Sequence, residues 1–297
     1  MLEKVKEKLL RQAALSFQKI PTRFISRQWG RFTRSAASRP LIKPFARLSG
    51  AVTTEAEKPL DQYRTLNEFF TRRLREGMRT VDPTPESVIS PADSRVSEWG
   101  TCTDGIMLQV KGRQYTLYEL LRDKRQADRL EGGPYITLYL SPPDYHWVHA
   151  PCDMKITGIG YMPGELLPVN PPSVESVPGL YTRNERVMIY AEGPCGPLVL
   201  VMVGACCVGS IKLTFHNLHT NTYGAGPMRM NFERPPVVGK GQPVGVFEMG
   251  STVVLIFSPG GVELSPPPLG TAVRMGQVIG NLAKKEREEL QPREERR

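Results

Sequence analysis

Two apolar runs meet at a Gly-Ser-Thr tripeptide in the stretch Val246-Phe247-Glu248-Met249-Gly250-Ser251-Thr252-Val253-Val254-Leu255-Ile256-Phe257. Each run has the length and the apolar character of a buried strand. A hairpin turn is the simplest interpretation of the tripeptide between them. A second interpretation is chemical: because glycine has no Cβ, the carbonyl of Gly250 is accessible to attack by the Ser251 hydroxyl. The tripeptide alone favours the turn, and the rest of the chain reverses that preference.

Short apolar runs separated by Gly and Pro continue through most of the chain after Pro83. They cover 88–89, 107–110, 135–140, 155–159, 187–190, 198–203, 244–247 and 253–257. This spacing predicts a β-rich core of mainly antiparallel or mixed strands. Helices are expected over 63–75, where Thr65 and Glu68 form a capping box, and over 115–121. We therefore expect an α+β fold, with amphipathic helices N-terminal to the β-rich core.

Charge is concentrated at the N-terminus of this 297-residue chain. Residues 1–50 hold 12 Lys and Arg against 2 acidic residues, a net of +10, while the remainder nets −1. This distribution argues against a nucleic-acid groove in the folded core. It suits a segment that meets an anionic surface, where each Lys or Arg contributes roughly 1 kcal/mol.

The basic N-terminal segment also carries apolar faces. Residues 2–20 have a helical pattern that Pro21 ends, and a second basic and aromatic stretch runs on to Leu48. Such helices indicate an interfacial membrane anchor, the alternative being amphipathic helices packed on the core. We expect three parts: membrane-associating helices over 1–50, a catalytic domain over 51–283 and a charged tail over 284–297. The apolar stretch 198–211 is too short for a spanning helix.

Five cysteines are present, and their odd number and spacing give no C-x-x-C pair. We expect all of them to be reduced, in a cytosolic protein without a structural zinc site. They are Cys102, Cys152, Cys195, Cys206 and Cys207.

The four histidines form two pairs, 146-x-x-149 and 216-x-x-219. His146 and His149 follow the predicted strand 135–140 in a proline-containing loop, a common location for catalytic groups. Their spacing leaves structural, catalytic and metal-binding roles open, and a metal would need two further ligands. Asp93 is either a turn residue or the group that orients a histidine. Ser251, His149 and Asp93 could then form a relay, if the fold brings them together.

The chain resembles the phosphatidylserine decarboxylases, self-cleaving pyruvoyl enzymes that make phosphatidylethanolamine. The resemblance covers most of the chain after about residue 60. Three positions depart from the usual pattern, namely Ser94, Trp147 and Met249, and none removes a reactive group. The matching motifs are 63–70, 91–93, 111–112, 115–117, 144–146, 148–149, 163–166, 169–170, 184–186, 203–205, 208–211 and 250–252.

The resemblance implies a maturation reaction at the tripeptide. With His149 as the base and Asp93 orienting it, Ser251 would attack the carbonyl of Gly250. Elimination and hydrolysis would leave a pyruvoyl cofactor derived from Ser251, a β chain ending at 250 and an α chain beginning at 251. The pyruvoyl group would form an imine with phosphatidylserine and release CO2, and His146 would contact the substrate and help to transfer a proton. No metal is implied.

The resemblance also implies partners and a location. The β and α chains of one precursor would stay associated, and a homodimer is compatible with the pattern. The partners would be phosphatidylserine and an anionic membrane surface, with no nucleic acid. The protein would be peripheral on the cytoplasmic face of the bacterial inner membrane.

Two rival functions are compatible with parts of the sequence. A serine hydrolase would use Ser251, His149 and Asp93 without self-cleavage, although the chain lacks the Gly-x-Ser-x-Gly elbow typical of many hydrolases. A non-enzymatic, membrane-bound β-domain would leave all three residues without a chemical role.

Overall fold

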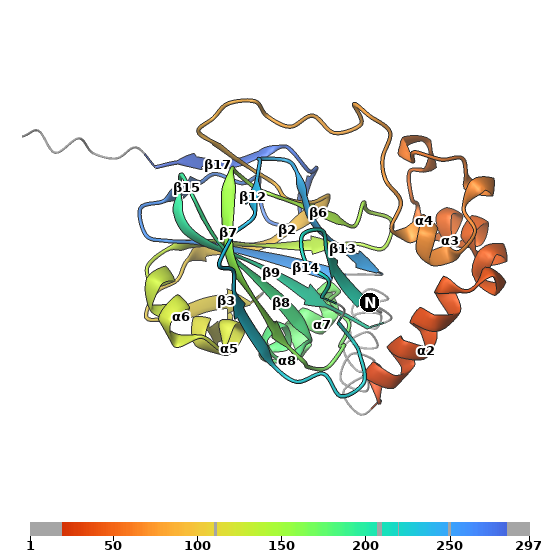
Figure 1. The fold of residues 1–297 in the computed structure, drawn as a ribbon, viewed down its shortest axis with the longest axis horizontal. Coiled ribbons are helices and arrows are strands. Elements are labelled where there is room, and N and C mark those ends of the chain that lie inside the picture. The colour runs from red at the N-terminus through yellow and green to blue at the C-terminus, as the bar shows by residue number, and fades with distance from the viewer. Residues whose placement is uncertain (1–19, 110–111, 207–209, 219, 249–250, 284–297) are drawn as a thin grey trace, which may run out of the picture.

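A nine-stranded sheet forms the centre of the molecule (Figure 1). The computed structural model describes residues 20–109, 112–206, 210–218, 220–248 and 251–283. The strand order is β11-β7-β8-β9-β14-β5-β2-β16, with β12 paired to β7. Every pair in this sheet is antiparallel. The strands are β2 (Ser94–Thr101), β5 (Pro134–Leu140), β7 (Met154–Met162), β8 (Arg186–Gly193), β9 (Gly196–Gly204), β11 (Met228–Asn231), β12 (Val237–Val238), β14 (Ser251–Phe257) and β16 (Ala272–Val273).

Smaller sheets complete the β structure. One has the order β10-β13-β6, a second has the order β1-β17-β15, and β3 pairs with β4 alone. Their strands are β1 (Ser87–Ile89), β3 (Ile106–Gln109), β4 (Arg113–Thr116), β6 (Trp147–His149), β10 (Ser210–Leu213), β13 (Pro243–Glu248), β15 (Val262–Leu264) and β17 (Val278–Leu282).

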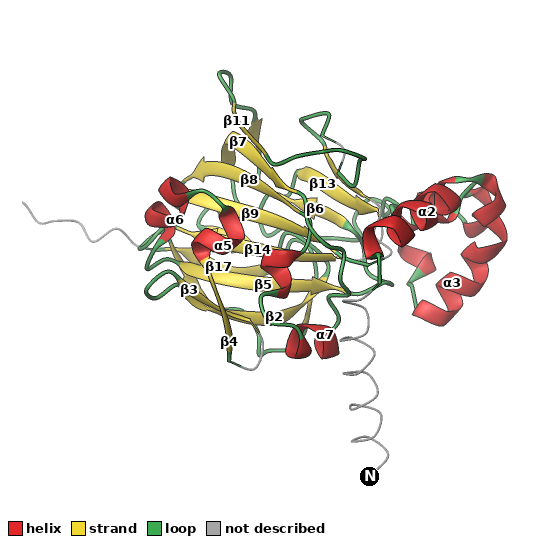
Figure 2. Cartoon of the chain, turned by 90° about the horizontal axis from the view of Figure 1, so that it is seen from below, coloured by secondary structure: helices red, strands yellow, loops and turns green. Residues whose placement is uncertain are grey.

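The helices form two groups (Figure 2). The N-terminal helices α2, α3 and α4 gather beyond one end of the central sheet, whereas the short helices α5 to α8 accompany the sheet itself. A separate apolar cluster holds the first group together through Ile42, Ala46, Tyr63, Leu66 and Phe69. The helices are α2 (Thr22–Arg34), α3 (Ile42–Ser49), α4 (Leu66–Phe70), α5 (Leu117–Leu121), α6 (Lys124–Leu130), α7 (Pro171–Ser176) and α8 (Leu180–Arg183), with 3-10 helices η1 (Ala36–Leu41), η2 (Thr53–Glu55) and η3 (Leu60–Gln62).

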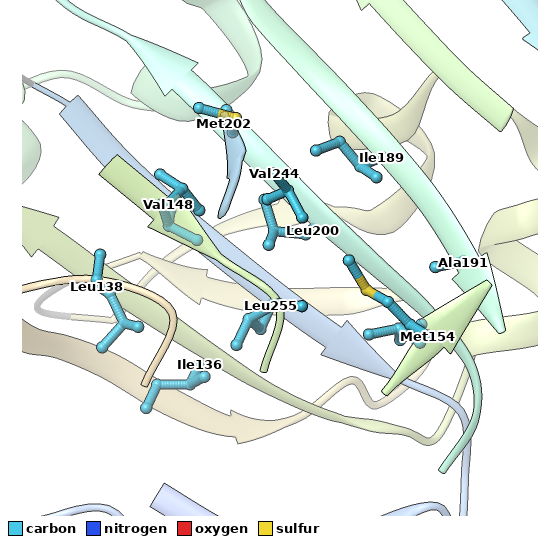
Figure 3. Close-up of a cluster of buried hydrophobic side chains, with 14 of the residues drawn as sticks. Ile136, Leu138, Val148, Met154, Ile189, Ala191, Leu200, Met202, Val244 and Leu255 are labelled. Carbon is cyan, nitrogen blue, oxygen red and sulfur yellow. The ribbon is translucent and has the colours of Figure 1, made fainter. Parts of the chain in front are cut away.

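Strand β14 is buried along its whole length because both faces of the central sheet are covered. Leu255 and its neighbours on one face pack with Val148 of β6 and Val244 of β13 (Figure 3). On the opposite face, Val254 and Ile256 pack beneath α5 to α8. Burial on both faces explains why the sequence of β14 is continuously apolar rather than alternating.

The observed fold confirms the predicted α+β class and the β-rich core. Seven of the eight predicted apolar runs lie in strands, and so do residues 107–109 of the eighth, whose last residue lies outside the described ones. The predicted helix over 115–121 is helical only over Leu117–Leu121, because residues 115–116 end strand β4. The predicted helix over 63–75 is shorter, because only Leu66–Phe70 is helical. Beyond Phe70, the backbone turns to the core, where the carbonyl of Thr71 accepts a hydrogen bond from the Trp147 indole at 2.9 Å.

Parts of the prediction fall on residues that the structure does not describe. The charged tail over 284–297 lies outside the described residues, as does all but the last residue of the predicted helix over 2–20. The boundaries of the three predicted parts of the chain stay predictions. Among the described residues, no helix has both the length and the apolarity required to cross a bilayer.

Candidate active site

Strands β13 and β14 adjoin along the chain but belong to different sheets. β13 pairs with β10 and β6, whereas β14 pairs with β5 and β9. Only Met249 and Gly250, which lie outside the described residues, separate the two strands. The strands of a hairpin pair with each other. The Gly-Ser-Thr tripeptide is therefore not a hairpin turn, and the chain passes from one sheet to the other directly before Ser251.

Ser251 is the first residue of β14 and is fully buried, with 0% of its surface exposed. It lies opposite Leu140 on one side and Gly204 on the other. Within the described part of the chain, its Oγ has no hydrogen-bond partner. A buried hydroxyl without a partner is costly in free energy, and such a group needs a functional or structural explanation.

His149 ends β6 and is held as a neutral base. Its Nδ1 lies 2.8 Å from the carbonyl oxygen of Gly241, and its Nε2 lies 3.2 Å from the Tyr145 hydroxyl. A carbonyl only accepts, so Nδ1 carries the proton and Nε2 accepts from Tyr145. Burial lowers the pKa of His149 below its ordinary 6.5, although the Gly241 hydrogen bond acts in the opposite direction. At neutral pH, Nε2 is unprotonated, and it can take a proton once the Tyr145 hydroxyl turns away from it.

Asp93 lies beside His149 but bonds to other groups. The backbone N–H of His149 donates to the carbonyl of Pro91 at 2.8 Å, which fixes the Asp93 segment against β6. The Asp93 carboxylate accepts from Arg79 Nε at 2.8 Å and from the backbone N–H of Met275 at 2.9 Å. It contributes to a higher His149 pKa without a hydrogen bond to the ring. The orienting contact comes from Gly241, and the predicted orienting role of Asp93 stays a prediction.

One of the two ring nitrogens of His146 is unsatisfied. Its Nδ1 lies 2.8 Å from the carbonyl of Asp144, and its ring packs on Phe70 with the centroids 4.1 Å apart. Burial lowers the pKa of His146 from 6.5 to about 3. Its Nε2 is buried and has no hydrogen-bond partner among the described residues. A neutral imidazole with a buried, unpaired acceptor suits contact with a ligand.

The backbones of β6 and β13 connect these groups. The carbonyl of His146 accepts from the backbone N–H of Phe247 at 3.1 Å, which places the histidine segment against the strand that leads to Ser251. Among the described residues, the Ser251 hydroxyl makes no direct hydrogen bond to His146 or His149. Asp93, His146 and His149 therefore lie at or beside β6, and β13, which pairs with β6, leads along the chain to Ser251.

Glu248 is a functional candidate that the sequence interpretation missed. Its side chain is 2% exposed, and its carboxylate pairs with Arg34 of α2 and with Lys212 Nζ of β10. Asn67 Nδ2 of α4 lies 3.4 Å away. Burial opposes ionisation, but the hydrogen bonds from Arg34 and Lys212 outweigh it and lower the Glu248 pKa. The sequence did contain a signal for Glu248, because it is the one acidic residue in an otherwise apolar strand.

Tyr145, Gly241 and Arg79 were also missed as contributors to the site. Tyr145 lies inside the motif that contains both histidines, so its position was visible although its contact was not. Gly241 contributes only a backbone carbonyl, which no residue pattern reveals. Arg79 lies in an irregular segment, and only the fold shows that it binds Asp93.

Only His216 of the second histidine pair can be described. His216 packs near Phe232, with ring centroids 6.0 Å apart, and His219 lies outside the described residues. In the described ranges, no three His, Cys, Asp or Glu side chains are arranged to hold a metal ion. Cys102, Cys152 and Cys195 are free thiols.

Known proteins resemble the chain over almost its whole length. A family model described as phosphatidylserine decarboxylase matches residues 66–281. A phosphatidylserine decarboxylase proenzyme from Anaeromyxobacter sp. (strain K) is 44% identical, across 89% of this chain and 96% of the relative. Proenzymes of the same name from Myxococcus xanthus and Brevibacillus brevis are 40% and 36% identical, across 89% and 88% of this chain and 95% and 94% of theirs.

Proposed function

The chain belongs to the phosphatidylserine decarboxylase family, and on that basis we propose that it decarboxylates phosphatidylserine after cutting its own backbone between Gly250 and Ser251. Membership of the family makes it a carboxy-lyase. The observation that best supports self-cleavage is the setting of Ser251, a fully buried serine with an unpaired hydroxyl where the chain crosses between two sheets.

Maturation uses groups that are present in the chain. Nε2 of His149 takes the proton of the Ser251 hydroxyl, and Oγ attacks the carbonyl carbon of Gly250. The peptide bond breaks as the ester forms. Elimination then releases the Gly250 carboxylate and leaves a dehydroalanine at 251, and one water replaces its nitrogen, which departs as ammonia. The products are a β chain of residues 1–250 and a 47-residue α chain of residues 251–297.

The residues around Ser251 fit the pyruvoyl group that this reaction leaves. β14 is paired on both sides from its first residue, so the new chain end is retained in the sheet after cleavage. When present, the keto group supplies the electron sink that decarboxylation needs. Burial of Ser251 separates the site from bulk solvent, apart from the one water that maturation consumes, and a water-poor site favours loss of a charged carboxylate.

His146 is suited to the proton transfer that completes decarboxylation. Its Nε2 is unpaired, and its position beside Phe247 puts it next to the strand leading to the reacting residue. Because burial keeps the ring neutral, His146 accepts a hydrogen bond in its resting state and donates only after gaining a proton. We assign it to substrate contact and proton delivery.

The rival serine hydrolase is less well supported. A hydrolase would need a separate substrate to reach the Ser251 hydroxyl of the uncleaved chain, where Ser251 is fully buried, whereas the decarboxylase meets its substrate only after the chain has been cut. The electrophile nearest to Ser251 along the chain is the carbonyl of Gly250. Both functions use the same side chains, and intramolecular attack requires no opening of the sheet.

We further propose that the protein binds the cytoplasmic face of the bacterial inner membrane through its N-terminal helices. Apolar side chains remain exposed there, with Phe24 60% and Leu48 87% exposed. They lie among basic residues and so combine apolar and electrostatic attraction to an anionic bilayer. Deletion of 1–50 is expected to weaken sedimentation with acidic liposomes, and undiminished binding would contradict this assignment.

A carbon dioxide assay tests the enzymatic proposal. Wild-type protein and the Ser251→Ala and His149→Ala variants are supplied with phosphatidylserine that is isotopically labelled at the serine carboxylate. We expect labelled CO2 from the wild type, inhibition by phenylhydrazine, and no product from Ser251→Ala. Activity in Ser251→Ala, or insensitivity of the wild type to the carbonyl reagent, would refute the proposed chemistry. Normal cleavage of His149→Ala would exclude His149 as the base.

A further inference from the structure

A basic cavity separates the N-terminal helix α2 from the sheet that carries the site. It has a volume of about 690 Å³ and lies between α2, β10 and the segment 220–223. Four cationic side chains line it, three from α2 and one from β10. They are Arg27, Arg31, Arg34 and Lys212.

Spacing along α2 explains why three arginines share this wall. Positions 27, 31 and 34 follow the i, i+4, i+7 pattern that places side chains on one face of a helix. Like charges at this spacing repel each other and destabilise the helix. Arg31 and Arg34 lie in the last turn, where they complement the helix dipole, but their repulsion by each other and by Arg27 would be relieved by an anionic ligand.

Most of the positive charge in the cavity is not neutralised by the protein. Arg34 and Lys212 share the single carboxylate of Glu248. Arg27 donates to the backbone carbonyls of Asn221 and Thr222, each at 3.1 Å, which fixes the guanidinium without cancelling its charge. Arg31 has no ion-pair or hydrogen-bond partner among the residues that the structure describes. Four cations against one carboxylate leave a net charge of +3.

The cavity connects the site to an apolar surface. Ser210, which lines it, is the register partner of Glu248, three residues before Ser251. Phe24, which also lines the cavity, belongs to the exposed apolar residues of α2. A ligand that contacts both Ser210 and Phe24 combines a polar head directed toward Ser251, an anionic centre and an apolar tail.

We propose that this cavity binds the phosphodiester of the phospholipid substrate, with Arg31 as its principal free cation. This inference rests on the proposed decarboxylase function, because it assigns the phosphate of that substrate. The planar guanidinium donates two parallel N–H groups to phosphate oxygens, a geometry that suits a phosphodiester monoanion. Arg27 and Arg34, held by their own partners, shape the cavity around it. The serine headgroup then extends toward Ser251 and the acyl chains leave along the apolar surface of α2.

A water-soluble substrate tests this assignment without a membrane. Dihexanoyl phosphatidylserine is used below its aggregation concentration, with Arg31→Gln and the matched control Arg125→Gln. Arg125 is an exposed arginine of α6 outside the cavity. Arg31→Gln is expected to lower kcat/KM roughly 10- to 100-fold, the usual worth of a hydrogen bond to a charged group, while chain cleavage and the Arg125→Gln activity stay normal. An unchanged kcat/KM in Arg31→Gln, or a loss seen only on anionic vesicles, overturns the proposal.

Direct binding separates this proposal from the proposed function and from a free-phosphate site. Calorimetry on the uncleaved Ser251→Ala chain, with and without Arg31→Gln, uses glycerophosphoserine and inorganic phosphate as probes. We expect glycerophosphoserine to bind more tightly than phosphate, and Arg31→Gln to weaken it 10-fold or more. Equal affinity for the two probes, or an affinity for glycerophosphoserine that Arg31→Gln leaves unchanged, would contradict the proposal. If the wild type releases no CO2, the decarboxylase function is refuted. The calorimetry would still show whether the cavity binds a phosphodiester through Arg31.

Discussion

The pair between Glu248 and Arg34 is predicted to connect the N-terminal helices to the strand before the cleavage site. Two unit charges about 4 Å apart interact by about 4 kcal/mol at an effective dielectric constant near 20. Glu248 is 2% exposed, but Arg34 is 42% exposed, so solvent screening reduces the expected coupling to about 1–2 kcal/mol. A double-mutant cycle of Glu248→Ala and Arg34→Ala measures it. Urea unfolding of chains that also carry Ser251→Ala keeps every variant a single chain.

The chain offers a matched control for this cycle. Lys124 and Asp128 form an ion pair one turn apart on α6, with side chains 78% and 62% exposed. Such an exposed pair is expected to couple by less than about 0.5 kcal/mol. If the coupling between Glu248 and Arg34 does not exceed that of the control pair, burial of Glu248 does not strengthen the connection and the reasoning is wrong.

The histidines and Tyr145 give three further predictions. The unfolded chain protonates His146 near pH 6.5 and the folded chain only near pH 3, so stability is complete above pH 6.5 and falls as pH decreases. Between pH 7 and 5, the wild type should lose about 2 kcal/mol more than His146→Asn, measured by urea unfolding in the Ser251→Ala background, and equal losses contradict the burial argument. The lowered His149 pKa makes a prediction for the rate of precursor cleavage, which can be followed after cell-free synthesis. As the pH decreases, this rate should fall to half its maximum at a pH below 6.5. A midpoint above pH 6.5 would exclude a buried neutral base. In the wild type, the Tyr145 hydroxyl donates to Nε2 of His149, and this hydrogen bond stabilises the neutral ring. Tyr145→Phe removes the hydroxyl and with it this stabilisation. Its midpoint should move up by roughly one pH unit, and an unmoved midpoint shows that the contact is not functional.

The strands most visible in the sequence were those buried on both faces. β14 and β9 are continuous apolar runs because protein covers both sides of their sheet, and both were predicted. β2 was missed because its outward positions are polar or exposed, including Arg95 and Glu98. β6 was missed because it is only three residues long and its pairing partner, β13, lies about a hundred residues away.

The site was predicted in its residue types and less well in its contacts. Gly-Ser-Thr, the histidine pair and Asp93 were identified from local motifs, and the fold places the last two side by side. The hydrogen bonds that fix them come from Gly241 and Arg79, which depend on tertiary packing. Similarly, Arg34 and Glu248 lie 214 positions apart, so no local pattern links them.

Weighing the purified protein under denaturing conditions shows whether the chain cuts itself between Gly250 and Ser251. Self-cleavage predicts two chains, residues 1–250 and 251–297, the shorter beginning with a pyruvoyl group in place of Ser251. The Ser251→Ala variant should give one chain close to the full 33.2 kDa. An active wild-type protein that weighs the same as its uncut sequence would contradict self-cleavage.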